Sequence, residues 1–258
     1  MVNDSADRER TDPFGQAKYQ VRFDWGLDGA RRIARGADIL VVVDALSFTT
    51  AVTVDAEHGV AVAPWGTDDA AGAAALAAEL GGVLAAPRGT DGPTLSPASY
   101  AAGSPSPVVL PSLNGGAIAR AFARDADVTV LAASLRNRSA TARRILELQE
   151  QRGRRLFVAV VAAGERGADG ARFAIEDQLV AGAVVDALVA LGIDHTSPEA
   201  AVACAAYEGL RQASTHLIGA SGSGAELAAA GFRDDVRLAT QRDATELVPE
   251  LRDGVFRA

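Results

Sequence analysis

The sequence predicts an α/β fold, a layered structure with a mainly parallel sheet flanked by helices. Two continuous apolar runs, ILVVV at 39–43 and LFVAVVA at 156–162, are typical of strands buried on both faces of a parallel sheet. Segments of helical character alternate with these and with weaker apolar runs along most of the chain. Purely helical and purely β folds are disfavoured because they lack this alternation.

The remaining elements follow from shorter patterns. Further strands are expected over 19–23, 60–63, 83–86, 108–110 and 128–132. Helices are expected over 28–35, 49–58, 67–80, 117–124, 138–151, 176–191, 198–217, 221–230 and 234–240. The segment 67–80 has the most complete helix signals, because Thr67 can cap its start and two glycines follow its end. A long loop that holds five of the ten prolines is expected over 87–107, and a mixed tail over 241–258.

Composition restricts the function classes. We expect one compact domain over 17–258, with 1–16 as a flexible lead-in and a subdomain split near 150 left open. The net charge of −8 argues against a nucleic-acid partner, and the single cysteine, Cys204, excludes an intrachain disulfide and a cysteine-based zinc site. No apolar run reaches roughly 18 residues and no secretory signal is visible, so a cytoplasmic location without a membrane partner is expected. Whether the chain forms a homo-oligomer is left open.

Polar turns follow four of the predicted strands. Asp44 comes directly after the strand 39–43. The four turns are 44–50 (DALSFTT), 112–116 (SLNGG), 134–137 (SLRN) and 164–166 (GER), of which the last leads to Glu176 and Asp177. Because the carboxyl ends of parallel strands share one edge of the sheet, we expect these turns to meet at one rim.

The residue types in these turns suit phosphoryl-group chemistry. Mg²⁺ prefers oxygen ligands and usually keeps several waters, and the candidate metal ligands are Asp44, Glu165, Glu176 and Asp177. Helix N-termini offer unpaired N–H groups to a phosphate, and neighbouring Asn and Ser side chains add donors. A metal ion beside a phosphate indicates phosphoryl-group chemistry.

Each turn also has a purely structural interpretation. Asp44 is a good helix N-cap, and Ser134 and Asn137 are ordinary caps. Asn-Gly-Gly at 114–116 is more often a turn than a ligand site. Glu176 and Asp177 complement the dipole of a helix N-terminus. Only the succession of such turns at one edge favours a functional site.

Taken in order, these motifs resemble the 2-phosphosulfolactate phosphatase family from about residue 38 to 250. The family pattern DVLRA[ST]TT resembles DALSFTT at 44–50, and TTNGT resembles SLNGG at 112–116. VLxGSxxNxxA resembles VLAASLRNRSA at 130–140. The most specific block, CAG followed by EDxLxAG, resembles AAG at 162–164 and EDQLVAG at 176–182. Near the end, LGFxxDV resembles AGFRDDV at 230–236, followed by Asp243 and Val-Pro at 248–249.

The resemblance implies a Mg²⁺-dependent phosphatase of the coenzyme M route and gives site status to Asp44, Asn114, Ser134, Asn137, Glu176 and Asp177. Three positions depart from the family pattern. Ser47 stands where the family has Arg, Pro87 replaces the Glu of a Gly-Glu-Arg motif whose Arg is Arg88, and Leu113 replaces a Thr. Because a bidentate Arg contact is not easily replaced by a hydroxyl, the natural substrate can differ from that of the family.

The leading hypothesis is a phosphatase with Mg²⁺ as cofactor and a small anionic phosphate monoester as substrate. The catalytic residues would be Asp44, Glu176 and Asp177. The substrate-binding residues would be Ser47, Thr49, Thr50, Arg88, Asn114, Gly115, Ser134, Asn137 and Arg166, with Arg88 or Arg166 receiving the other acidic group of the substrate.

Two alternatives remain open. One is a non-catalytic family member that binds a phosphorylated metabolite. The other is a haloacid-dehalogenase-like phosphatase with Asp44 as nucleophile, which Leu46 opposes. The metal hypothesis requires Asp44 to lie within about 12 Å of Glu176 and Asp177.

Overall fold

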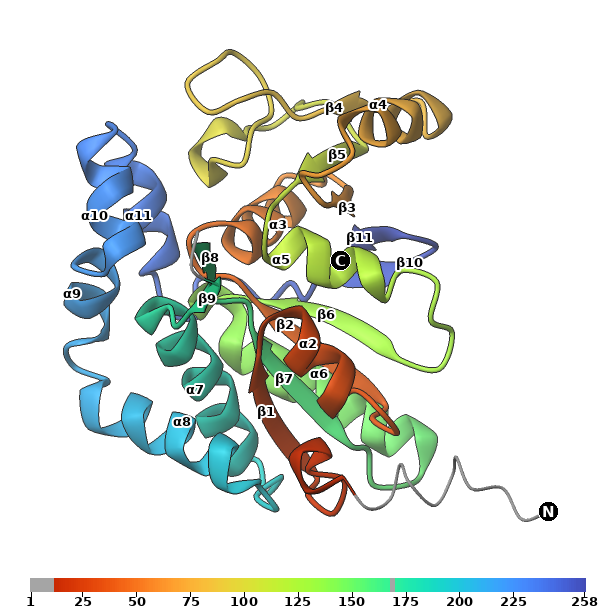
Figure 1. Cartoon of the computed structure of the whole chain (residues 1–258), viewed down its shortest axis with the longest axis vertical. Coiled ribbons are helices and arrows are strands. Elements are labelled where there is room, and N and C mark those ends of the chain that lie inside the picture. The colour runs from red at the N-terminus through yellow and green to blue at the C-terminus, as the bar shows by residue number, and fades with distance from the viewer. Residues whose placement is uncertain (1–11, 168–169) are drawn as a thin grey trace.

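The computed structural model describes residues 12–167 and 170–258, and its architecture is the predicted one. Nine strands form one sheet in the order β1-β7-β2-β6-β10-β11-β3-β5-β4, from bottom to top in Figure 1. The strands are β1 (Val21–Trp25), β2 (Ile39–Val43), β3 (Val62–Trp65), β4 (Val83–Leu84), β5 (Val108–Pro111), β6 (Thr129–Ala133), β7 (Val158–Ala162), β10 (Glu250–Arg252) and β11 (Val255–Arg257). All pairs except those of β10 and β11 are parallel. The α/β prediction is confirmed.

Helices cover both faces of the sheet. They are α2 (Gly26–Ile33), α3 (Phe48–Glu57), α4 (Ala70–Glu79), α5 (Gly115–Ala121), α6 (Arg138–Arg152), α7 (Ile175–Ala190), α8 (Pro198–Leu210), α9 (Ser214–Gly219), α10 (Gly222–Ala229) and α11 (Arg233–Ala239). Short 3-10 helices are η1 (Pro13–Gly15), η2 (Pro97–Ser99) and η3 (Leu135–Asn137). In the part of the chain that is described, no helix combines the length and the apolar character that a membrane crossing requires.

The position of β2 between two helical layers explains why its sequence is continuously apolar. Ile39, Val41 and Val43 pack into the core formed with α6, α7 and α8, whereas Leu40 and Val42 pack into the core on the other face with α2, α3 and α5. All five side chains are completely buried. Successive side chains of a strand point to opposite faces, so a strand between two helical layers has no polar position.

The register of the central strands brings their ends to one level. Val43 of β2 lies opposite Ala133 of β6 and Ala162 of β7. Residues that follow these three strands therefore meet at the carboxyl edge of the sheet. This is the edge where ligands bind in open α/β sheets.

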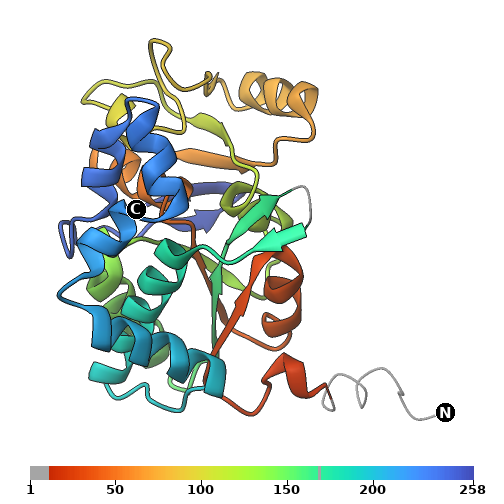
Figure 2. The same ribbon diagram turned by 60° about the vertical axis from the view of Figure 1, so that its left-hand side comes forward.

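The predicted tail over 241–258 is wrong in part, because its end forms the hairpin β10–β11. The hairpin lies in the middle of the sheet and joins two parallel halves, with Glu250 opposite Leu131 of β6 and Phe256 opposite Val62 of β3. A second short hairpin, β8 (Glu165–Gly167) and β9 (Gly170–Arg172), follows β7, where only a loop was expected (Figure 2). Three-residue strands carry too little periodicity to be recognised locally.

Most of the predicted lead-in, residues 1–11, lies outside the described residues. Asp12 to Gln16 form a turn that includes η1. The buried Gln16 amide fixes this turn to β1, since it accepts a hydrogen bond from Phe23 N at 3.0 Å and donates one to Phe23 O at 2.8 Å. The domain boundary itself stays a prediction.

The position of β11 between two halves of the sheet predicts a large loss of stability for Phe256→Ala. Phe256 is 1 % exposed and its ring lies edge-on to Phe48, with 6.3 Å between the ring centroids. Truncation of a buried Phe costs about 3–5 kcal/mol, which urea unfolding measures. The control Arg257→Ala changes an exposed neighbour and should change the free energy of unfolding by less than about 0.5 kcal/mol. Equal effects of the two substitutions would contradict this packing.

Candidate active site

Asp44 joins the N-termini of two helices at the carboxyl edge. Its Oδ1 accepts a hydrogen bond from Phe48 N of α3 at 3.2 Å, and its Oδ2 accepts one from Gly115 N of α5 at 2.8 Å. The Ser112 hydroxyl lies 3.5 Å from the same Oδ2. Asp44 therefore bonds to the first main-chain N–H of α3, although the N-cap position of this helix is Ser47 and not Asp44. The contact with α5, 71 residues away, goes beyond a local cap.

Gly115 permits this approach of α5 because it has no side chain. A Cβ atom at this position would lie 2.6 Å from Oδ2 of Asp44 and 2.8 Å from Cδ1 of Phe48. Real Cβ contacts are not this short, so any other residue would displace the carboxylate or the helix. Gly115, in the turn predicted at 114–116, is thus also required for the close approach of α5 to Asp44.

Asp177, in the first turn of α7, connects the ends of β2 and β7. Its Oδ1 accepts a hydrogen bond from Ala45 N at 2.7 Å, and its Oδ2 accepts one from Gly164 N at 2.9 Å. The carboxylate therefore contacts the residue next to Asp44. Glu176 is also buried, and no hydrogen bond from the described residues reaches its carboxylate.

Burial and mutual repulsion disfavour the charged forms of Asp44 and Asp177. Burial raises the pKa of Asp177 well above its usual value, and the charges of Asp44 and Glu176 raise it further, against the hydrogen bonds from Ala45 and Gly164. Burial also raises the pKa of Asp44, against the hydrogen bonds from Gly115 and Phe48, and the Glu176 charge adds to the rise. A cation at this edge would relieve the repulsion.

The donor set suits Mg²⁺ held by one or two carboxylates and water. All the side-chain donors are carboxylate oxygens, which this ion prefers. Asp44, Glu176 and Asp177 do not form a closed three-ligand cage. Among the described residues, only a different group of three side chains has ligand atoms that all lie within 4.8 Å of one another. An ion that keeps several waters does not need such a cage.

That other group, Asp186, Cys204 and Glu208, has poor properties for a metal site. The Asp186 carboxylate already binds two guanidinium groups, from Arg138 at 2.9 Å and Arg211 at 2.7 Å. Burial, with the nearby charges of Glu208 and Asp186, raises the pKa of the Cys204 thiol to about 11. A thiol that stays protonated at neutral pH is a weak ligand.

Several predicted substrate-binding residues are engaged with the protein itself. The hydroxyls of Thr49 and Thr50 are buried and donate to the carbonyl oxygens of Asp44 (2.9 Å) and Ala45 (2.7 Å). These bonds shape the turn after β2. Ser47 instead accepts a hydrogen bond from Nη2 of Arg88 at 2.7 Å.

Ser134 and Asn137 form a capping box at η3. Asn137 Oδ1 accepts from Ser134 N at 2.8 Å, and its Nδ2 donates to the carbonyl oxygens of Ala132 (3.2 Å) and Leu247 (3.1 Å). Both amide protons are thus engaged, and the geometry favours the structural interpretation of this pair. Their predicted role in substrate binding stays untested.

Glu165 and Arg166 lie on β8 beside the carboxyl edge. The Glu165 carboxylate accepts hydrogen bonds from Arg172 and Ser223. Burial acts to raise the pKa of Glu165, but these two bonds outweigh it and the pKa is lowered. The Glu165 carboxylate is therefore charged and already paired with Arg172 and Ser223.

A cavity of about 300 Å³ opens beside this edge. Asn114 lines it, and the side chain of Asn114 makes no hydrogen bond with the described residues. Two arginines also line it, Arg166 from β8 and Arg31 from α2. Arg31 was not predicted, because a lone arginine in a helix has no signal that points to a site. Asp235, which binds Arg88, was also missed, although it lies in the matched block 230–236.

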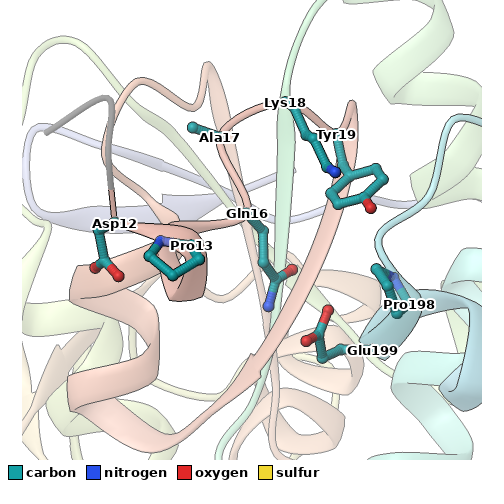
Figure 3. A pocket seen from close by; sticks show the side chains of 8 residues that line it. All are labelled: Asp12, Pro13, Gln16, Ala17, Lys18, Tyr19, Pro198 and Glu199. Atoms are coloured by element: carbon teal, nitrogen blue, oxygen red, sulfur yellow. The ribbon is translucent and has the colours of Figure 1, made fainter.

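Figure 3 shows a different cavity, of about 330 Å³, between the start of β1 and the start of α8. It lies at the amino end of β1, opposite the edge that carries Asp44. The Gln16 amide that lines it is bonded to the main chain of Phe23. This cavity therefore adds nothing to the acidic site.

Comparison with family models matches residues 30–254 to 2-phosphosulpholactate phosphatase. The chain belongs to this family. Its activity class is therefore that of a phosphatase, a phosphoric monoester hydrolase. A search of curated proteins found no match. The matched range includes all the turns that meet at the carboxyl edge of this family member.

The close contact between α5 and Asp44 predicts that Gly115→Ala impairs both folding and phosphatase activity. The added methyl group would lie 2.6 Å from the carboxylate, so we expect a loss of at least about 1–3 kcal/mol in urea unfolding. The matched control is Gly209→Ala in α8, where a Cβ meets nothing within 4 Å. That substitution should be neutral or stabilising by about 0.5–1 kcal/mol. A Gly115→Ala protein as stable and active as the wild type would contradict this geometry.

Proposed function

We propose that this family member is a Mg²⁺-dependent phosphatase of the cytoplasm that hydrolyses a small anionic phosphate monoester such as 2-phosphosulfolactate, as in coenzyme M biosynthesis. One observation carries the proposal: Asp44, Glu176 and Asp177 are buried together at the carboxyl edge, with raised pKa values for both aspartates. Proteins avoid such groups of like charge unless a cation or a function requires them.

Glu176 is the carboxylate best suited to hold the ion, with Asp44 and Asp177 as its neighbours. The hydrogen bonds from main-chain N–H groups hold both aspartates in place, whereas described residues make no hydrogen bond to Glu176. When bound, Mg²⁺ neutralises charge on the phosphoryl oxygens and lowers the pKa of a bound water.

The chain supplies the contacts that orient the ester. Asn114 offers a side-chain amide to a phosphate oxygen from the wall of the cavity that it shares with Arg31 and Arg166. Arg88, which donates a hydrogen bond to Ser47, supplies a guanidinium next to the turn that carries Asp44. Charge-assisted bonds of this kind are the strong ones for oxyanions.

A family member that binds a phosphorylated metabolite without turnover is the second candidate, since Ser47 and Leu113 depart from the family pattern. Both candidates would bind the phosphorylated ligand, but only the phosphatase would hydrolyse it. An Asp44 nucleophile is less well supported, because both of its carboxylate oxygens accept main-chain hydrogen bonds.

Phosphate release tests the proposal directly. Purified protein with Mg²⁺ should release phosphate from 2-phosphosulfolactate or phospholactate. Glu176→Gln should lower kcat by about 100-fold or more, because it removes the charge of a buried catalytic carboxylate. Glu199→Gln is the matched control, since Glu199 is also in the first turn of a helix but is exposed. Ligand-induced thermal stabilisation with no turnover on a broad panel of phosphate esters would support the binding protein instead.

Ion binding has a readout that does not require activity. Because the pKa values of Asp44 and Asp177 are raised, the folded protein binds protons more tightly than the unfolded chain, where Asp titrates near about 3.9. Without the ion, stability therefore falls as the pH rises from about 4 through the raised pKa values. Saturating Mg²⁺ replaces these protons, so its increase in Tm should be larger at about pH 8 than at about pH 5.

Glu176→Gln should reduce this Mg²⁺-dependent increase in Tm, whereas Glu199→Gln should retain it. An increase that is independent of pH and of Glu176 would place the ion elsewhere on the protein.

A further inference from the structure

We propose that Asp235 of α11 is a positioning residue that orients the Arg88 guanidinium toward an oxyanion of the substrate. The inference rests on the proposed function, since it assigns Arg88 to substrate binding. It adds a residue from the C-terminal helices, which supply none of the catalytic carboxylates.

Asp235 uses its two carboxylate oxygens for two different purposes. The side chain is buried, with 1 % of its surface exposed. Its Oδ2 binds Nη1 of Arg88. Its Oδ1 accepts hydrogen bonds from the Ser96 hydroxyl and, at 3.4 Å, from Ala98 N. One oxygen therefore holds the guanidinium and the other holds the segment that carries it.

Arg88 is fixed from three sides. Besides the ion pair with Asp235, its Nη2 donates to the Ser47 hydroxyl at 2.7 Å. Its guanidinium carbon lies 5.5 Å from the centroid of the Phe232 ring. A planar guanidinium with two hydrogen bonds and an aromatic neighbour has little freedom to rotate.

The fold brings this arginine to the site from the far end of the sheet. Arg88 lies in the segment between β4 and β5, which is drawn in yellow tones in Figure 1. The short helix η2 of this segment packs against both α3 and α11. Arg88 thereby reaches Ser47, three residues after Asp44 and in the same turn.

The ion pair leaves the guanidinium able to bind a ligand. The Arg88 side chain is 20 % exposed, and a guanidinium has more N–H donors than the two bonds to Asp235 and Ser47 use. A buried carboxylate behind a partly exposed cation fixes its direction, and a small misplacement of such a group lowers catalysis strongly.

A double-mutant cycle tests the proposal. Asp235→Asn keeps an acceptor for Ser96 and Ala98 but turns an amide group toward Arg88, so the ion pair is lost. We expect KM for phospholactate to rise about 10-fold or more with a smaller change in kcat. In the Arg88→Ala background, Asp235→Asn should cause no further rise, because the two residues act as one unit. Additive effects on KM would overturn the proposal.

Two controls separate positioning from folding. Ser96→Ala removes the hydrogen bond that tethers the segment but keeps the ion pair, so KM should stay near the wild-type value. Asp234→Asn changes the exposed neighbour of Asp235 and should have no effect on KM. If Ser96→Ala reproduces the effect of Asp235→Asn, the carboxylate only tethers the segment and the proposal fails.

A comparison of two substrates identifies which oxyanion of the substrate Arg88 binds. p-Nitrophenyl phosphate has no second acidic group. If the substitutions raise KM for phospholactate alone, Arg88 binds the carboxylate of that ester. If they raise KM for both substrates, Arg88 binds the phosphoryl group. If the wild type hydrolyses no ester, the proposed function fails. The same cycle is then measured on the Kd of phospholactate, which carries both oxyanions, where loss of binding in both single variants without additivity supports the positioning role. Wild-type phospholactate binding that neither substitution changes overturns it.

Discussion

The Asp177 carboxylate accepts hydrogen bonds from main-chain N–H groups that follow two neighbouring strands, at Ala45 and Gly164. This buried contact is the constraint on which the site depends. It fixes the start of α7 against the ends of β2 and β7. Asp44 does the same for α3 and α5 through Phe48 and Gly115. The site is therefore held by the main chain, and it does not depend on surface side chains to keep its shape.

These contacts place negative charges where water is largely excluded. The main-chain hydrogen bonds offset part of the desolvation, yet the pKa values of Asp44 and Asp177 remain raised. The free-energy cost of burying these carboxylates is offset by the packing of the sheet. Its central strand, β2, is completely buried between two helical layers. A stable core of this kind lets a protein maintain a local site that opposes folding.

The C-terminal part of the chain completes the sheet and pairs with Arg88. The hairpin β10–β11 joins the two parallel halves, and the preceding helix α11 supplies Asp235 to Arg88. Ser47, where the family pattern has an arginine, receives its guanidinium contact from Arg88 in another loop. Family membership thus describes the class of chemistry, while the contacts of Arg88 with Ser47 and Asp235 join parts of the chain that are far apart in sequence.

The sequence by itself determined the α/β class, the extent of β2 and the position of Asp44 at its carboxyl end, because the period of a buried strand and the parallel topology are local and general rules. Only the tertiary structure decided that Asn137 bonds to main-chain carbonyls, that Glu165 pairs with Arg172, and that Phe256 lies in mid-sheet. The Arg88–Asp235 pair spans 147 residues. No local pattern encodes such a contact, since it exists only once the strands are ordered and the helices are packed.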